Sequence, residues 1–69
     1  MTKIFVYING EKFFLNKKIS LQNLLKFIDL NTKGIVIEHE KVLVEKEFYS
    51  KTFLINSTSL EILSLVGGG

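Results

Sequence analysis

The sequence contains no cysteine, no arginine, no proline and no tryptophan. Without cysteine the chain has no disulfide, no thiolate ligand for a metal and no thiol nucleophile, so any sulfur that it handles must come from another molecule. Its nine basic residues are all lysines, which lack the bidentate guanidinium fork that favours recognition of phosphate and guanine. No apolar run approaches the roughly 20 residues that span a bilayer. We therefore expect neither a nucleic acid nor a membrane as partner.

The chain is also too short for a substantial pocket beside its core. Its 69 residues make one domain, and at this size a core supplies only about 3 to 5 kcal/mol of stability. We therefore expect a protein that is not an enzyme, has no catalytic or metal-ligating residues and binds no cofactor. The absence of proline and the abundance of Lys, Ile, Asn and Phe are typical of an AT-rich genome. Since the sequence starts with a strand pattern in place of a signal segment and has no membrane-spanning run, we expect a cytoplasmic protein, or one of the plastid stroma if an organelle encodes it.

The first 15 residues predict a β-hairpin. Ile4, Val6 and Ile8 alternate with Lys3, Phe5 and Tyr7, which is typical of a strand. Asn9-Gly10 follows and is the strongest short signal for a two-residue type I′ turn. Such a turn fixes the register of the strands. The predicted pairs are Ile8 with Glu11, Tyr7 with Lys12, Val6 with Phe13, Phe5 with Phe14 and Ile4 with Leu15.

One helix and further strands follow. Ser20 precedes an i, i+3, i+4, i+7 stripe of Leu21, Leu24, Leu25 and Ile28, which predicts a helix with a serine N-cap that runs to about Leu30, with Asn31 as a left-handed C-cap. Apolar, β-branched runs at 35–38 and 42–44 predict two strands that flank a polar turn, His39-Glu40-Lys41. Phe48-Tyr49 is expected to pack an irregular turn against the core. A turn cluster at 56–59 leads into a final strand that ends at the glycines.

This order predicts an α+β protein with the β-grasp (ubiquitin-like) fold. The final strand lies beside the first in a mixed four- to five-stranded sheet, and one main helix crosses one face. The domain spans residues 1–66, and residues 67–69 form a glycine tail. The alternative is another small α+β domain with a different strand order.

Strand parity predicts a docking surface on the sheet face away from the helix. In the last strand Glu61 marks the solvent side, which sends Leu60 and Ile62 toward the helix. Five large side chains then share the outer face: Phe5, Tyr7, Phe14, Leu63 and Leu65. A monomer has no reason to gather such groups away from its core, so we expect a partner to cover them. The alternative is that they are scattered surface residues, or that a bulge shifts the parity.

The last three residues are the strongest functional feature. Gly67, Gly68 and Gly69 follow the final strand directly, cost conformational entropy and contribute no packing. Three extended residues carry a carboxylate about 10 Å beyond the strand, and the missing Cβ atoms allow a narrow channel. We expect this tail to enter a partner's active site. The alternative is a frayed end or the remnant of a linker.

Other candidate residues carry little chemistry. His39 is the only histidine and lies beside Glu38 and Glu40, a pattern more typical of a solvated turn than of a metal site. Glu45 and Glu47 are expected on a solvated face or at the rim of a partner contact, and not as an acid–base pair. The 57–59 cluster has no histidine at useful spacing for a nucleophile.

The element order, the length and the closing residues resemble the ThiS family of sulfur carriers in thiamine biosynthesis. The resemblance covers the whole chain and rests on the apolar start leading to Asn9-Gly10, the helix after Ser20 with Leu24-Leu25, and the ending Val66-Gly67-Gly68-Gly69. The small subunit of molybdopterin synthase and Urm-type modifiers have similar tails, but those chains are usually longer.

The resemblance implies a role as a protein co-substrate. A ThiF-like adenylating enzyme would use ATP and Mg²⁺ to convert the Gly69 carboxylate to an acyl-adenylate. A persulfide, supplied by a cysteine desulfurase or another sulfur donor, would turn it into a thiocarboxylate. Thiazole synthase (ThiG-like) would then take the sulfur.

Three alternatives remain open from the sequence. The chain could carry sulfur for molybdopterin synthesis or for tRNA thiolation. It could be a ubiquitin-like modifier that is joined to lysine amines through Gly69. It could also be a non-covalent β-grasp interaction domain whose tail is incidental.

Overall fold

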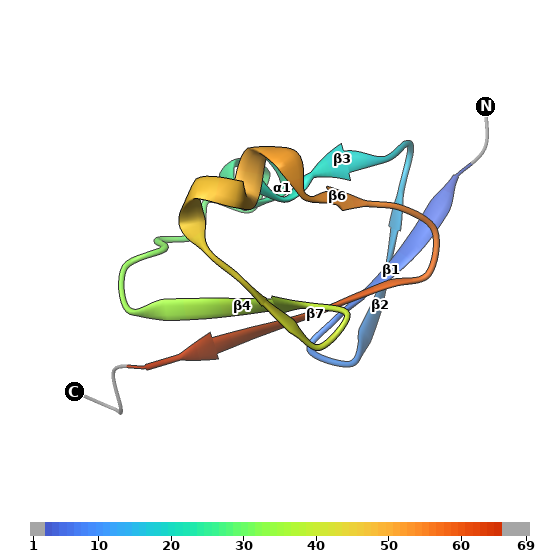
Figure 1. Cartoon of the computed structure of the whole chain (residues 1–69). Helices are drawn as coiled ribbons and strands as arrows, with labels where there is room; N and C mark the ends of the chain where they lie inside the picture. The colour runs from blue at the N-terminus through green and yellow to red at the C-terminus, as the bar shows by residue number, and fades with distance from the viewer. Residues whose placement is uncertain (1–2, 66–69) are drawn as a thin grey trace.

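A five-stranded mixed sheet forms one layer of the molecule, and a second layer of short elements covers one of its faces (Figure 1). The computed structural model describes residues 3–65. The sheet consists of β1 (Ile4–Ile8), β2 (Glu11–Leu15), β4 (Ile35–His39), β5 (Val42–Val44) and β7 (Thr58–Ser64). The covering layer consists of β3 (Ile19–Ser20), α1 (Leu21–Phe27), the 3₁₀ helix η1 (Lys46–Lys51) and β6 (Phe53–Leu54).

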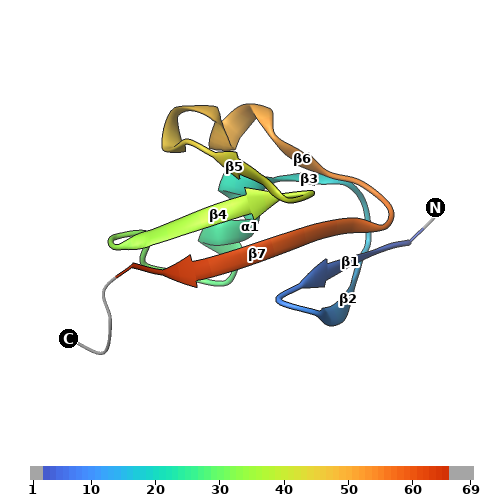
Figure 2. The same ribbon diagram turned by 60° about the horizontal axis from the view of Figure 1, so that its bottom comes forward.

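The strand order is β2-β1-β7-β4-β5, so the last strand along the chain lies in the middle of the sheet. β7 runs parallel to β1 and antiparallel to β4, and Figure 2 shows it between them. This arrangement confirms the predicted ubiquitin-like β-grasp fold. The two-residue strands β3 and β6 pair with each other outside the main sheet; the sequence analysis did not predict this ladder.

The hairpin has the predicted register at all five pairs, from Ile8 with Glu11 to Ile4 with Leu15. Its turn residues, Asn9 and Gly10, have φ values of 51° and 85°. Positive φ at both central positions is the mark of a type I′ turn, whose twist matches that of the flanking strands. The two-residue turn therefore fixes which side chains of β2 face the helix.

The helix begins as predicted and ends earlier. The Ser20 hydroxyl accepts a hydrogen bond from the Asn23 N–H (3.1 Å), which satisfies one free donor of the first turn. The predicted end near Leu30 is wrong, because Asp29 takes the left-handed conformation (φ 56°) in place of Asn31. The Asp29 and Leu30 N–H groups then donate back to the carbonyls of Lys26 and Leu25, both at 3.1 Å. These two bonds form a Schellman motif that closes the helix after seven residues.

Two turns in the second half also differ from their predictions. The β4–β5 turn consists of Glu40 and Lys41 (φ 52° and 69°), and His39 is the last residue of β4, half-buried between Val42 and Leu60. The cluster at 56–59 is not all turn, because Thr58 and Ser59 already belong to β7. Thr58 is buried, and its hydroxyl accepts a hydrogen bond from the Ile55 N–H (2.9 Å). A polar residue can therefore begin a buried strand, because its hydroxyl satisfies the preceding turn.

The core lies between the sheet and the covering layer. Its buried members come from β1, α1, β4, η1, β6 and β7: Val6, Leu21, Leu24, Leu25, Ile37, Tyr49, Leu54 and Leu60. Tyr49 of η1 packs into this core as predicted, whereas its neighbour Phe48 is about half exposed. Within residues 3–65, no helix has the length and hydrophobicity to cross a bilayer.

Candidate functional site

Strand β7 leads toward the glycine tail in the sequence, and the last residue that the structure describes, Leu65, is still hydrogen-bonded, to Gly34. The Leu65 N–H donates to the Gly34 carbonyl at 2.7 Å, one residue beyond the last strand pair, Ser64 with Ile35. The segment therefore keeps a defined direction up to Leu65. The predicted tail residues, Gly67, Gly68 and Gly69, lie outside the described residues.

Two side chains extend the pairing of β7 beyond its neighbouring strands. The Asn9 side chain accepts a hydrogen bond from the Ile62 N–H (2.7 Å) and donates one to the Ile62 carbonyl (3.3 Å). Glu40 accepts from the Ser59 N–H through its carboxylate (2.8 Å), and its own N–H donates to the Ser59 carbonyl (2.9 Å). Asn9 and Glu40 each occupy the first position of a two-residue turn, so both turns hold the central strand in addition to reversing the chain.

The predicted strand parity is confirmed. Leu60 is fully buried against the covering layer, and Ile62 is partly buried in the same core. Leu63 alternates with them and faces outward with 42% exposure, and Leu65, one residue past the strand, is 68% exposed. The structure therefore places large apolar groups on the uncovered face of the sheet. Their role in docking stays a prediction.

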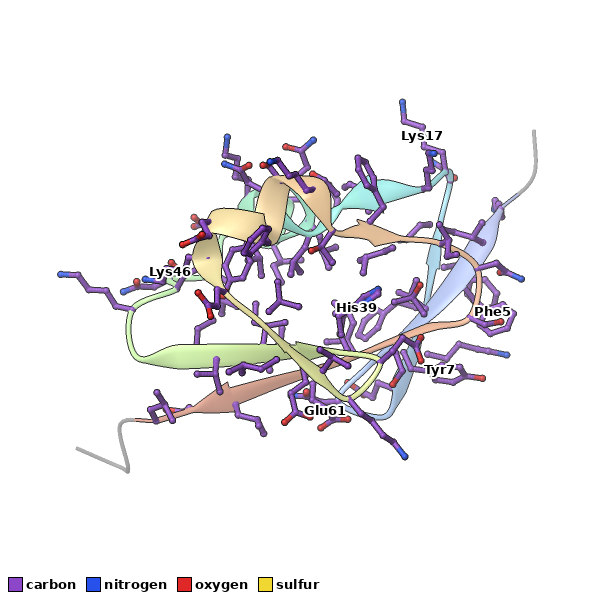
Figure 3. The ribbon with its side chains drawn as sticks, viewed as in Figure 1. Phe5, Tyr7, Lys17, His39, Lys46 and Glu61 are labelled. Atoms are coloured by element: carbon purple, nitrogen blue, oxygen red, sulfur yellow. The ribbon has the colours of Figure 1, made fainter. Side chains whose placement is uncertain are left out.

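An aromatic cluster occupies the β1–β2 end of this face. The rings of Phe5 and Tyr7 meet edge to face, with centroids 5.7 Å apart, and Figure 3 shows both side chains on the same side of β1. The Lys12 ammonium lies 4.5 Å from the centroid of Phe5, 6.0 Å from that of Tyr7 and 5.8 Å from that of Phe14. A cation at these distances is attracted to the ring faces, so one lysine side chain partly covers the three predicted aromatic residues.

The five predicted docking residues form two groups and not one patch. Tyr7 pairs with Ser59, so β1 ends beside Leu60 and does not reach Leu63. Leu63 instead pairs with Val36 of β4, which the sequence analysis did not include. The offset between the parallel strands separates the aromatic cluster (Phe5, Tyr7 and Phe14) from an aliphatic group, which we define as Val36, Leu63 and Leu65.

A pair of carboxylates lies between the two groups. Glu38 and Glu61 are direct partners in the antiparallel ladder of β4 and β7, so their side chains share the outer face. Leu43 pairs with Glu38 on the other side and is 58% exposed. Directly opposed like charges are destabilising in a sheet. Strand alternation could have predicted the positions of Val36, Glu38 and Leu43, because all three lie on strands that the sequence identified.

The other candidates of the sequence analysis are not brought together. Glu45 occupies the N-cap position of η1 without a side-chain capping bond, and Glu47 lies in the first turn; both are exposed. His39 is the last residue of β4 (Figure 3). Among residues 3–65, no group of three or more His, Asp or Glu side chains is placed to hold a metal ion. Thr58 is buried and bonded to its own turn, which removes it as a nucleophile. Burial raises the pKa of the Tyr49 phenol, which keeps this core residue neutral.

Comparison with solved structures defines the class of protein. The thiamine biosynthesis protein (ThiS) from Geobacter metallireducens superposes with a TM-score of 0.83, covering 96% of this chain and 100% of its own, at 19% sequence identity. The chain thus has the ThiS-like form of the ubiquitin-like β-grasp fold. No protein-family model matches it.

Sequence comparison identifies the family within that class. The chain is 37% identical over 68 residues to ycf40 of Pyropia yezoensis, covering 99% of this chain and 96% of that protein. It is 36% identical over 66 residues to ycf40 of Porphyra purpurea, with 96% and 93% coverage. It is 33% identical over 73 residues to ycf40 of Trieres chinensis, with complete coverage of both. The chain belongs to the ycf40 family.

Proposed function

We propose that this protein is a sulfur carrier whose Gly69 carboxylate is converted to a thiocarboxylate. The observation that supports the proposal most is the course of β7, a central strand braced on both sides that leads into three glycines. A strand held in this way aims the tail, and glycines let it enter a narrow channel. The ThiS-like fold is consistent with this function.

The chemistry requires activation by a partner. A carboxylate is ionised at neutral pH and is a poor electrophile. In the proposed first step, a ThiF-like enzyme with ATP and Mg²⁺ transfers AMP to the carboxylate and releases pyrophosphate. The terminal sulfur of a persulfide then attacks the acyl carbon, and AMP leaves. The carrier itself catalyses nothing and binds no cofactor.

The second half of the transfer leaves sulfur on the tail. The acyl carbon is now linked through a disulfide to the sulfur donor, a cysteine desulfurase or a persulfide protein. A thiol attacks the donor's sulfur, the S–S bond breaks, and the thiocarboxylate is the leaving group. Because the chain has no cysteine, both thiols belong to partners. The proposed acceptor is thiazole synthase, in the aqueous phase of the cytoplasm or, for an organelle-encoded chain, of the plastid stroma.

The outer sheet face is the proposed docking surface for these enzymes. The aliphatic group (Val36, Leu63 and Leu65) lies at the C-terminal end of β7, and the aromatic cluster lies beside the start of that strand. Burial of apolar surface contributes about 25 cal/mol per Å², so a patch of a few hundred Å² would supply most of the free energy of a micromolar interaction. A partner that covers this face would hold the tail at its own active site.

Intact-mass spectrometry tests the proposal. The chain is incubated with a cognate adenylating enzyme, ATP, Mg²⁺ and a persulfide source. We expect a product heavier by the difference between sulfur and oxygen, with the change confined to Gly69. A chain extended by one residue and the Gly69→Ala variant are the matched controls and should stay unmodified. Thiocarboxylate formation by the extended chain would reject the mechanism.

The same experiment separates the alternatives. Isopeptide conjugates without any sulfur-containing product would favour a ubiquitin-like modifier. Unchanged biological activity after deletion of Gly68 and Gly69 would favour a non-covalent interaction domain. If the thiocarboxylate forms but does not react with thiazole synthase, assays with molybdopterin synthase and with tRNA-thiolating enzymes identify the acceptor.

A further inference from the structure

Strand β2 forms an open edge of the sheet. It is five residues long and is paired only with β1; Figure 2 shows it at the border of the sheet. Proteins commonly protect such an edge with proline, a bulge or a covering segment. β2 has no proline, and its regular register with β1 leaves no bulge. Its outer main-chain groups are therefore accessible to another strand.

The hairpin register identifies those groups. In a hairpin with a two-residue turn, the closing pair exchanges both main-chain hydrogen bonds, and such pairs then alternate along the strands. Ile8 and Glu11 are the closing pair here, so Glu11, Phe13 and Leu15 bond inward to β1. Lys12 and Phe14 consequently direct their N–H and C=O groups away from the sheet.

An apolar groove runs beside this edge, between β2 and α1. Its volume is about 360 Å³, and its apolar lining comes mainly from Phe14, Leu15, Ile19, Leu24 and Phe27. Phe27 is the most exposed large apolar residue in the described part of the chain, at 81%. Leu24, by contrast, is buried at the base. A strand added to β2 would direct alternate side chains toward this groove.

The charged residues along the segment that forms the groove are lysines, and the acidic residues Glu11 and Asp29 lie just outside it. Between residues 12 and 28 the chain carries Lys12, Lys17, Lys18 and Lys26 and no acidic residue, and Lys17 lines the groove itself. Figure 3 shows Lys17 at the top of β2, where the chain leaves the sheet. Two copies of this chain paired through β2 would bring identical basic segments together. An acidic partner fits the edge better than a second copy.

We propose that the β2 edge and its groove bind an extended segment of another protein that has apolar residues at alternate positions and acidic residues at its ends. The segment adds as a sixth strand beside β2. Its main chain bonds to Lys12 and Phe14, its apolar side chains occupy the groove, and its acidic ends face the lysines. This surface shares Lys12 and Phe14 with the aromatic cluster but includes no member of the aliphatic group (Val36, Leu63 and Leu65). An enzyme that docks on the aliphatic group alone would therefore leave the edge site open.

A synthetic peptide provides the direct test. The probe has alternating valine and threonine residues, aspartates at both ends and a fluorescent label; the control peptide has lysines in place of the aspartates. By fluorescence anisotropy we expect saturable binding of the acidic peptide with Kd below about 1 mM, and at least tenfold weaker binding of the basic one. Hydrogen exchange should slow at the Lys12 and Phe14 amides. Equal binding of both peptides, or no binding, would overturn the proposal.

Substitutions on β2 separate main-chain pairing from simple apolar contact. Phe14→Pro removes an outward N–H without removing a hydrogen bond to β1, and Phe14→Ala removes the same ring but keeps the N–H. We expect the proline variant to bind the peptide at least fivefold more weakly than the alanine variant. Phe27→Ser, at an exposed position, should weaken binding by a similar factor. Circular dichroism establishes that each variant remains folded.

Two further measurements distinguish strand addition from other modes of association. Equal affinities of the Phe14→Pro and Phe14→Ala variants would show that the edge is not used, and dimers of the peptide-free chain in sedimentation would make a second copy the occupant; either result rejects the proposal. A chain without Gly68 and Gly69 should bind the peptide with unchanged Kd. The peptide-binding experiment therefore tests the edge site independently of the proposed sulfur transfer.

Discussion

The side chain of Asn9 forms two hydrogen bonds with the main chain of Ile62, although the two residues are 53 positions apart. Asn9 accepts from the Ile62 N–H at 2.7 Å and donates to the Ile62 carbonyl at 3.3 Å. Strand β1 has already ended at Ile8, so the amide of Asn9 takes the place of the next peptide group. The central strand therefore stays paired on this side as it approaches the tail.

Replacement of Asn9 tests this contact. Asn9→Gly preserves the positive φ of the turn but removes both bonds, and we expect a loss of about 1 to 3 kcal/mol in the free energy of unfolding, since each bond contributes about 0.5 to 1.5 kcal/mol. Asn9→Asp retains the acceptor, loses the donor and places a carboxylate beside the Ile62 carbonyl, so it should also destabilise. Urea denaturation measures both effects. Unchanged stability of the glycine variant would show that the bonds contribute nothing.

The stability cost of replacing Gly10 should depend on how readily the new residue adopts positive φ, and not on the size of its side chain. Its φ is +85°, and no heavy atom other than those of Gly10 and its two chain neighbours lies within 4 Å of the position that a Cβ would occupy. We expect Gly10→Ala to cost about 1 kcal/mol and Gly10→Asn to cost less, because asparagine adopts positive φ more readily. Thermal unfolding compares the two variants. Equal losses would point to a steric cause that this open position does not predict.

Tyr49 should make the fold sensitive to alkali. Burial raises the pKa of its phenol above the ordinary value of 10.0, so the neutral form is favoured in the folded state. Its contribution to stability is complete below the unfolded pKa and is lost as pH rises through the raised pKa of the folded state. The control is Tyr49→Phe, which lacks the phenol and keeps every other titratable group. In urea denaturation, the wild type should lose more stability than this variant between about pH 9 and pH 11.

The aliphatic group should contribute to partner binding and little to folding. Leu63→Asp or Leu65→Asp should weaken binding to the adenylating enzyme by more than about 1 kcal/mol, with a small change in the free energy of unfolding. Phe48→Asp is the matched control, because Phe48 has similar exposure but lies on η1. Isothermal titration calorimetry measures the affinities. Leu60→Ala, in the core, should instead cost about 2 to 5 kcal/mol of stability. Unfolding of the Leu63 variant would contradict the face assignment.

Much of the fold follows from local signals in the sequence. The Asn9-Gly10 turn fixed five strand pairs, and alternation around Glu61 placed Leu60 and Leu63 on opposite faces correctly. The errors at the end of the helix and at the start of the last strand have different causes. Asp29 ended the helix early through a left-handed residue, and the Thr58 hydroxyl closed a turn from within a strand.

The candidate site was harder to predict than the fold. The outer residues were correctly assigned to one face, but their division into two groups depends on the stagger of β7 along β1, with Tyr7 opposite Ser59. Neither strand encodes that stagger locally. The β3–β6 ladder, of two residues per strand, is too short to give a periodic signal.

The central position of β7 also constrains synthesis of the protein. Strands β1 and β2 can pair early, and so can β4 and β5, but the two hairpins share no partner until residues 58–64 have been made. Pairing across such long separations is slow compared with local pairing. Before residues 58–64 are made, the nascent chain therefore holds two unjoined hairpins with uncovered apolar surfaces. A ribosome-associated chaperone would bind these surfaces during that time. A ribosome stalled before Thr58 would leave a chain that cannot complete its sheet.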